Sequence, residues 1–270
     1  MQDSCAKPGN DGTALCGELR GRLKSLADKY ENADFLTADP SRFLRFYSEP
    51  KEQELLAFVT AQLAFGQREQ FIARLERMLE SVGGGLFSEW LLGGGYKKFF
   101  PKSEKKFYRF FSFADMNSLC RRLAQIVSES GSLGQAVREE YARPSNAAVP
   151  KELRLVSALV RLFPKQKCVS QNPRGACKKL HMFLRWMVRQ NSPVDLGLWK
   201  WASAADLLIP LDTHVLQEAA RLGLIAKNAS ASAKTAIELT QKMAQVFPGD
   251  PARADFALFG LGVDKNNEQK

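Results

Sequence analysis

Histidine, paired cysteines and long apolar runs are scarce or missing in this chain. Only 2 of its 270 residues are histidine, which argues against a histidine-rich metal site. The 5 cysteines are odd in number and scattered, without CxxC spacing, so we expect neither a disulfide framework nor a zinc or iron–sulfur centre. No stretch of about 18 consecutive apolar residues occurs, so no membrane span is predicted. These absences predict a protein with no metal, no cofactor and no membrane partner.

The N-terminal segment lacks the apolar core of a secretion signal, so we expect a cytoplasmic protein. Hydrophobic residues make up 45% of the chain and charged residues 25%, which is ordinary for a globular protein with a sizeable core. The charge balance is less ordinary, because 39 lysines and arginines face 29 acidic residues and leave a net charge of +10. Such an excess favours polyanionic partners, nucleic acid first among them.

Apolar residues recur at three- and four-residue spacing along most of the chain, which predicts helices of about 10–15 residues. The sequence shows no convincing alternating strand pattern and no internal repeat, so the predicted fold class is all-α. The pattern of the first segment is expected to break near Gly66 and to end at Gly83. The helical segments are 54–85, 113–131, 132–142, 151–163, 177–190, 213–224, 233–247 and 251–263.

A basic loop, residues 164–176, separates two of these helices, and Lys178 and Lys179 open the second one. Adjacent ammonium groups disfavour each other, and the partial positive charge at a helix N-terminus disfavours both. The pKa of one amine is therefore expected to fall below the ordinary value of about 10.4, which would make that amine a nucleophile. The alternative is that both lysines simply point into water.

Asp212 stands in the motif IPLDTHV, directly after an apolar run and at the start of a later helix. Aspartate is a favoured N-cap residue, so a purely structural role is one interpretation. Val215 occupies the position where a capping box would place glutamate or glutamine, which weakens that interpretation. The other interpretation is that Asp212 is a catalytic carboxylate.

The motifs around these residues resemble those of a little-characterised bacterial family with the IPLDTHV signature. Through it they resemble the helix-hairpin-helix DNA glycosylase superfamily, to which endonuclease III and the 8-oxoguanine glycosylases belong. The similarity reaches back weakly to about residue 20. The motifs that carry it are CKKL at 177–180, FLRWMVR at 183–189, VDLGLW at 194–199 and IPLDTHV at 209–215.

This resemblance implies a fold of two helical lobes with a DNA cleft between them. A disordered N-terminus is expected over residues 1–15, a single glycosylase-like unit over 16–263 and a flexible tail over 264–270. The hairpin and the catalytic helices are expected within about 150–225. The superfamily hairpin reads G-x-G before the lysine, whereas here only Gly175 is present.

The resemblance also implies an activity, namely a DNA N-glycosylase with AP-lyase activity in base excision repair. A damaged base such as 8-oxoguanine would be removed by a lysine amine, with Asp212 as the catalytic carboxylate. Lys178 is the preferred amine and Lys179 the alternative. The four-cysteine loop of endonuclease III is missing, so no iron–sulfur cofactor is implied. Two alternatives remain open: a DNA-binding relative without the chemistry, and a structural site in a protein that binds another protein.

The expected partner is double-stranded DNA with a damaged or abasic site, bound by a monomer. Gln62 lies in an AQ segment similar to one in the glycosylase superfamily, whose glutamine can fill the gap left by a flipped base. The alternative is that Gln62 is an ordinary exposed helix glutamine. Segment 96–111 interleaves basic and aromatic residues, which suits phosphate contact and base stacking but also suits a core. The other expected DNA contacts are Arg68, Arg174, Gly175, Arg185 and His214.

Overall fold

The computed structural model describes residues 15–268, without the side chains of residues 37, 38 and 263–268. The N-terminal segment expected to be disordered therefore lies outside the described residues, except for its last residue. The last two residues of the expected flexible tail also lie outside them, whereas the rest of that tail continues the backbone of the final helix.

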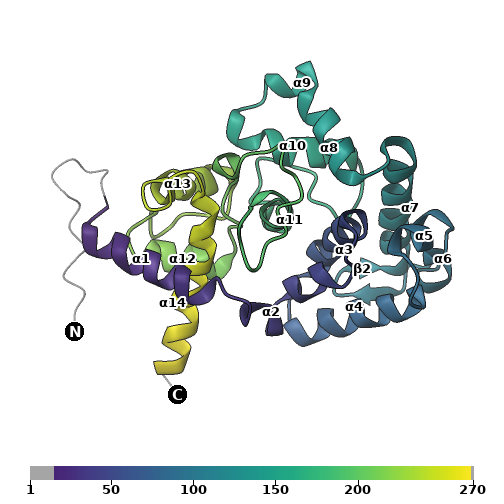
Figure 1. Cartoon of the computed structure of the whole chain (residues 1–270), viewed down its shortest axis with the longest axis horizontal. Helices are drawn as coiled ribbons and strands as arrows, with labels where there is room; N and C mark the ends of the chain where they lie inside the picture. Colours follow the sequence, from purple (N-terminus) through teal and green to yellow (C-terminus); the bar gives the residue numbers. More distant parts are fainter. Residues whose placement is uncertain (1–14, 269–270) are drawn as a thin grey trace. The chain divides into compact units, whose positions relative to one another are not determined.

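The described chain is predominantly helical, which confirms the predicted all-α class (Figure 1). Its only strands are β1 (Lys106–Tyr108) and β2 (Phe111–Ser112), a short antiparallel pair that the sequence pattern did not predict. None of the described helices has the length and apolar character needed to cross a membrane.

Two compact units make up the chain, and their boundary is not a single cut in the sequence. The middle unit comprises Leu36–Pro173. The terminal unit combines residues up to Phe35 with Arg174–Lys270. Each unit has its own set of helices.

The middle unit is built around α3 (Pro50–Leu63), in which every residue from Glu54 to Leu63 is buried and most of these residues are apolar. The carboxylate of Glu52, in the first turn of α3, accepts hydrogen bonds from the amide and the hydroxyl of Ser88 at 2.8 and 2.5 Å and so holds α5. Its helices are α2 (Phe35–Ala38), at the boundary, η1 (Pro40–Arg45), α3 (Pro50–Leu63), α4 (Arg68–Val82), α5 (Phe87–Leu92), α6 (Tyr96–Phe99), α7 (Phe113–Ser130), α8 (Leu133–Ala142), α9 (Pro144–Ala147), η2 (Lys151–Leu153) and α10 (Arg154–Leu162).

The terminal unit joins the two ends of the described chain, because α1 packs along α14 (Figure 1). The ring of Tyr30 meets the ring of Phe259 edge to face, with ring centroids 6.1 Å apart. A Cβ at Gly260 would clash with the ring of Tyr30, so the missing side chain permits this close approach. The helices are α1 (Gly17–Tyr30), α11 (Lys178–Val188), η3 (Ala204–Asp206), α12 (Thr213–Arg221), α13 (Ala233–Ala244), η4 (Pro251–Arg253) and α14 (Ala254–Glu268).

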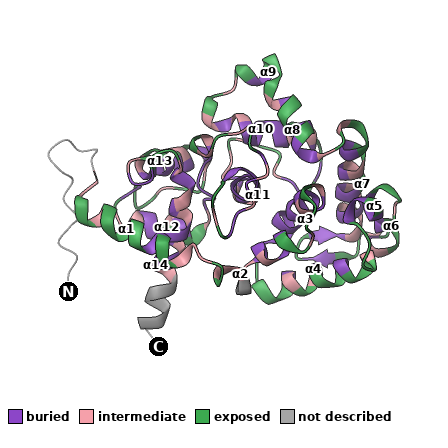
Figure 2. Cartoon of the chain, in the orientation of Figure 1, coloured by how far each residue is buried: buried purple, intermediate pink, exposed green. Residues whose placement is uncertain are grey.

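Most of α11 is inaccessible to solvent, with every residue from Leu180 to Val188 buried (Figure 2). Its first two residues, Lys178 and Lys179, keep part of their surface exposed. The helix is therefore a rigid core element that presents only its N-terminal end to solvent.

Candidate active site

Lys178 and Asp212 form an ion pair within the terminal unit. Lys178 is the first residue of α11, and Asp212 immediately precedes α12. The Nζ atom of Lys178 lies 3.6 Å from the Oδ2 atom of Asp212. The side chains keep 32% and 34% of their surface exposed, so a solute can reach both groups.

The two oxygens of Asp212 have different partners. Oδ1 accepts a hydrogen bond from the backbone amide of Val215 at 2.9 Å, which makes Asp212 the N-cap of α12. Oδ2 faces Lys178. The capping bond fixes the orientation of the carboxylate, so the structural and the catalytic interpretations of this residue are compatible.

The start of α11 is held by the residues just before it. Gly175 forms an antiparallel bridge with Ser232, and the Arg174 carbonyl accepts from the amide of Ala233 at 3.1 Å. These contacts tie the segment to the beginning of α13. Cys177 then adopts a left-handed conformation, φ 43° and ψ 33°, which turns the chain into the helix without a side-chain cap.

Arg185 lies two turns beyond Lys178 on the same face of α11, and its guanidinium is buried. Its Nε lies 3.3 Å from Oδ1 of Asp195, and its NH1 contacts the carboxylate of Asp255. The guanidinium also lies 4.4 Å from the ring centre of Phe256. This burial argues against the expected contact of Arg185 with DNA, because its guanidinium contacts Asp195 and Asp255 inside the protein.

Arg189, one turn further, joins three carboxylates to the same network. Its NH2 lies 2.8 Å from Oε1 of Glu31 and 2.8 Å from Oδ2 of Asp250, and its NH1 contacts Asp195. Burial raises the pKa of Asp195, although Arg185 and Arg189 act in the opposite direction. Burial alone would also raise the pKa of Glu31, but Arg189 and other hydrogen-bond partners bring it below its ordinary value. The network therefore links the end of α1, α11 and the start of α14 through paired side chains.

Asp255, in the first turn of α14, couples this network to the exposed pair. Burial raises the pKa of Asp255 to about 6. Arg185 opposes this shift, the carboxylate of Asp212 adds to it, and Lys178 opposes it. The side chain keeps 18% of its surface exposed. A change of charge at Lys178 or Asp212 therefore changes the pKa of Asp255.

His181 lies one turn beyond Lys178 and has 2% of its surface exposed. Burial lowers the pKa of His181 to about 4, so the imidazole is neutral near pH 7. Its Nε2 atom has no hydrogen-bond partner among the described residues. No group of three or more histidine, cysteine or acidic side chains in the described chain is placed to hold a metal ion.

The remaining expected site residues lie in both units. In the terminal unit, Lys179 is the second residue of α11, while Arg174 and His214 are exposed. In the middle unit, Arg68 is exposed at the first position of α4. Gln62 has no exposed surface, and its Nε2 donates to the carbonyl of Phe58 at 3.4 Å. A contact of Gln62 with DNA would require this side chain to turn outward.

The acidic residues beneath the pair, Asp195, Asp250 and Asp255, were not among the expected site residues. One signal for them was present, since Arg185 and Arg189 interrupt an otherwise apolar helix pattern. A cation on a buried face requires carboxylate partners. The sequence does not say which of its 29 acidic residues these partners are.

Fold and site together define a predominantly helical protein with a lysine–aspartate pair at the starts of two helices. The chain belongs to the family described as "Protein of unknown function (DUF2400)", which matches residues 39–264. The match includes both Lys178 and Asp212. No curated protein and no solved structure matches the chain.

Proposed function

We propose that this protein is a DNA N-glycosylase with AP-lyase activity, of the helix-hairpin-helix type. The observation that carries the proposal is the 3.6 Å separation between Nζ of Lys178 and Oδ2 of Asp212, both solvent-accessible. An amine nucleophile beside a carboxylate is the pair that covalent base excision requires. The net charge of +10 supports a DNA partner, which would place the protein in the cytoplasm.

The first stage releases the damaged base. The target nucleotide rotates out of the duplex, the Lys178 ammonium releases a proton to water, and the resulting amine attacks C1′ of the sugar. The bond from C1′ to the base breaks, and its electron pair leaves with the base, which takes up the proton that the amine gives up. Positive charge develops on the sugar during this step, and the carboxylate of Asp212 stabilises it.

The second stage cleaves the strand. Opening of the sugar ring converts the C1′ adduct into a Schiff base with Lys178. Loss of a proton from C2′ then expels the 3′ phosphate, and the bond between C3′ and its oxygen breaks. Water hydrolyses the Schiff base and restores the amine. Asp212, whose orientation is held by Val215, is the group placed to move protons during these steps.

The position of Nζ supports Lys178 rather than Lys179 as the amine. Consecutive residues of a helix point about 100° apart, so the two lysines face different directions. Lys178 faces Asp212 and shares its helix face with the buried Arg185. An oxidised purine such as 8-oxoguanine is the proposed base.

One observation favours a second function. Asp212 caps α12, so the fold alone explains why an aspartate stands at this position. In that case the protein would be a DNA-binding relative without catalytic activity. Both functions predict salt-sensitive binding to duplex DNA, whereas only the glycosylase with AP-lyase activity predicts strand cleavage.

The test compares base release and strand cleavage under single-turnover conditions, on duplexes with one 8-oxoguanine or one abasic site. Wild type is compared with Lys178→Gln, Lys179→Gln and Asp212→Asn. We expect Lys178→Gln to abolish cleavage, and Lys179→Gln to retain it within about threefold. DNA binding without cleavage of either duplex by wild type would favour the non-catalytic relative.

A further inference from the structure

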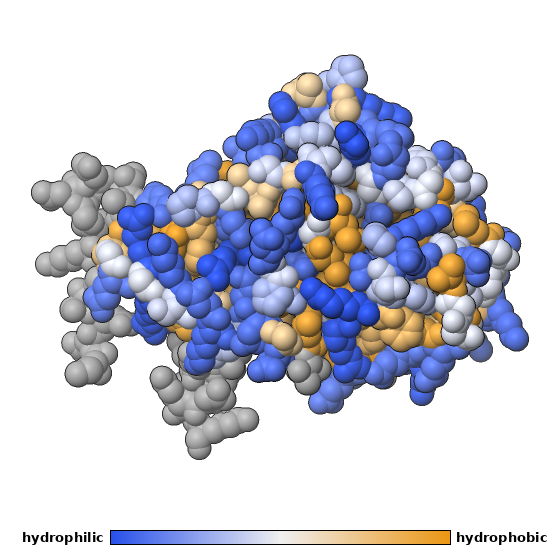
Figure 3. Space-filling view, in the orientation of Figure 1, coloured by the Kyte–Doolittle hydropathy of each residue, from blue (hydrophilic) through white to orange (hydrophobic). Residues whose placement is uncertain are grey.

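The surface of the middle unit carries exposed apolar side chains that the proposed chemistry does not use. The exposed large apolar side chains of the described chain, Phe46, Leu86, Leu92 and Phe110, all belong to this unit. Figure 3 shows several apolar patches on the right-hand side, where α4 to α7 lie. Phe110 is the most exposed of the four, at 71%.

Phe110 differs from its aromatic neighbours. Phe107, Tyr108 and Phe111 are almost fully buried and belong to the core. The base stacking expected of segment 96–111 is thus excluded for most of its rings, but Phe110 remains available at the turn between β1 and β2. The ring of Phe110 is therefore accessible to a ligand, whereas the rings of its aromatic neighbours in the strand pair are not.

A second ring holds Phe110 in place. Phe65 stacks against it with ring centroids 4.9 Å apart and an interplanar angle of 23°. The hydroxyl of Tyr108 donates a hydrogen bond to the carbonyl of Phe65, which ties the strand pair to the segment between α3 and α4. The two rings therefore form a preorganised apolar platform.

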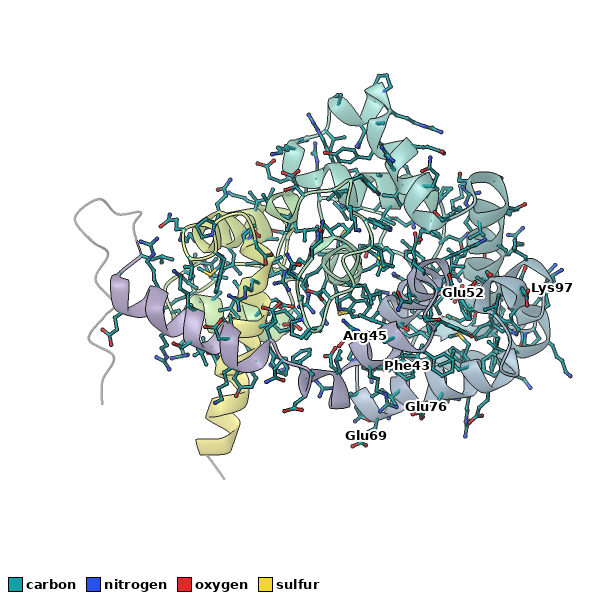
Figure 4. The ribbon with its side chains drawn as sticks, viewed as in Figure 1. Phe43, Arg45, Glu52, Glu69, Glu76 and Lys97 are labelled. Atoms are coloured by element: carbon teal, nitrogen blue, oxygen red, sulfur yellow. The ribbon has the colours of Figure 1, made fainter. Side chains whose placement is uncertain are left out.

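Exposed cations lie on the two segments that carry these rings. Arg109, at the turn with φ 54°, and Lys106 are exposed on the strand pair. Arg68 is exposed at the start of α4, just after the Phe65 segment. The Arg109 side chain lies over Gly66, where an added Cβ would come within 3.3 Å of its Nε. The acidic residue nearest to Arg68 in the sequence is Glu69, in the first turn of α4 (Figure 4).

We propose that Phe110 and Phe65 form a platform on which an unpaired nucleobase stacks, while Arg109 and Arg68 contact neighbouring phosphates. Aromatic rings bind any base through its π face, and flanking cations attract the backbone. This inference rests on the proposed DNA substrate but not on the chemistry of Lys178. Removing one stacking ring is expected to weaken binding by about 5- to 100-fold per base.

The experiment measures binding by fluorescence anisotropy at constant salt, with a fully paired duplex and the same duplex carrying one unpaired 2-aminopurine. Phe110→Ala should lose at least fivefold affinity for the duplex with the unpaired base and less than twofold for the paired duplex. Phe110→Trp should bind as wild type does. The matched control is Phe46→Ala, since Phe46 is also exposed, at 56%, in the same unit.

The fluorescence of 2-aminopurine gives a second readout, because stacking quenches it. Wild type should quench the probe, and Phe110→Ala should not. Equal affinity and quenching in wild type and Phe110→Ala would overturn the inference, and so would equal losses in Phe110→Ala and Phe46→Ala. If wild type prefers the duplex with the unpaired base through Phe110 but cleaves no strand, the stacking platform stands and only the proposed glycosylase activity is refuted.

Discussion

Lys178 and Arg185 stand two helical turns apart on one face of α11, and each is paired with a carboxylate from outside that helix. The outer pair, Lys178 with Asp212, is about one-third exposed, whereas Arg185 and its partner Asp255 lie mostly inside the protein. A buried charge network thus supports an accessible amine. This arrangement gives the proposed nucleophile a fixed position without enclosing it.

Substitutions of Asp212 separate its two roles. Asparagine also caps helices, so the free energy of unfolding of Asp212→Asn should lie within about 0.5 kcal/mol of the wild-type value. The rate of base release should nevertheless fall at least about 100-fold. Asp212→Ala loses the cap as well and should be less stable by about 1 kcal/mol. Urea unfolding and single-turnover base release measure the two effects. Full activity of Asp212→Asn would leave capping as the only role.

Removing Arg185 should destabilise the protein strongly, because Asp255 would lose the arginine that pairs with it and Asp195 would lose one of its two arginine partners. We expect Arg185→Ala to lower the free energy of unfolding by about 3–5 kcal/mol. The matched control is Arg42→Ala, since Arg42 pairs with the partly exposed Glu76 of α4. Glu76 is labelled in Figure 4. Arg42→Ala should cost less than about 1 kcal/mol. If urea unfolding shows the same decrease in unfolding free energy for Arg185→Ala and Arg42→Ala, the buried network contributes little to stability.

The charge of Asp255 should make stability depend on pH in a defined direction. Burial raises the pKa of Asp255 to about 6 in the folded state, from an ordinary value of 3.8. The folded state therefore binds this proton more tightly than the unfolded chain does. The contribution of Asp255 to stability is greatest at low pH and declines as pH rises from about 4 to about 6.

Asp255→Asn removes this dependence. The free energy of unfolding of wild type minus that of the variant should be larger at pH 4 than at pH 7 by about 2 kcal/mol. The lowered pKa of His181 has the opposite effect on acid stability, but it is common to both proteins and cancels in the difference. A difference that is the same at both pH values would contradict the raised pKa.

Gly260 should tolerate no side chain, because an added Cβ would clash with Tyr30. We expect Gly260→Ala to destabilise the protein by about 1–3 kcal/mol through overpacking. Gly262 lies on the same helix with nothing within 4 Å of an added Cβ. Gly262→Ala should therefore be neutral or stabilise by up to about 1 kcal/mol. Thermal unfolding of both variants checks the contrast between the two glycines.

Local signals in the sequence were enough to place many helix ends. The predicted break near Gly66 lies between α3 and α4, and α4 ends at Val82 before Gly83, which adopts the left-handed conformation at φ 71°. The chain also enters α11 at Lys178, as the pattern of basic and apolar residues predicts. These features depend on neighbouring residues only, so a single sequence carries them.

Features without a local sequence signal, and features that depend on distant residues, were not predictable in this way. The strands β1 and β2 are too short to show an alternating pattern. Phe110 looks the same in the sequence as the buried Phe111, although the two are 71% and 2% exposed. The pairing of Glu31 with Arg189 joins residues from opposite ends of the chain. Only the folded structure brings such partners together.

The most direct test of the central claim is to trap the covalent intermediate and identify the amine. Borohydride is added during reaction with a duplex that contains one abasic site, and the cross-linked peptide is mapped by mass spectrometry. We predict a DNA remnant on Nζ of Lys178, lost in Lys178→Gln and kept in Lys179→Gln. An adduct on another lysine, or no adduct from wild type that binds this DNA, would contradict it.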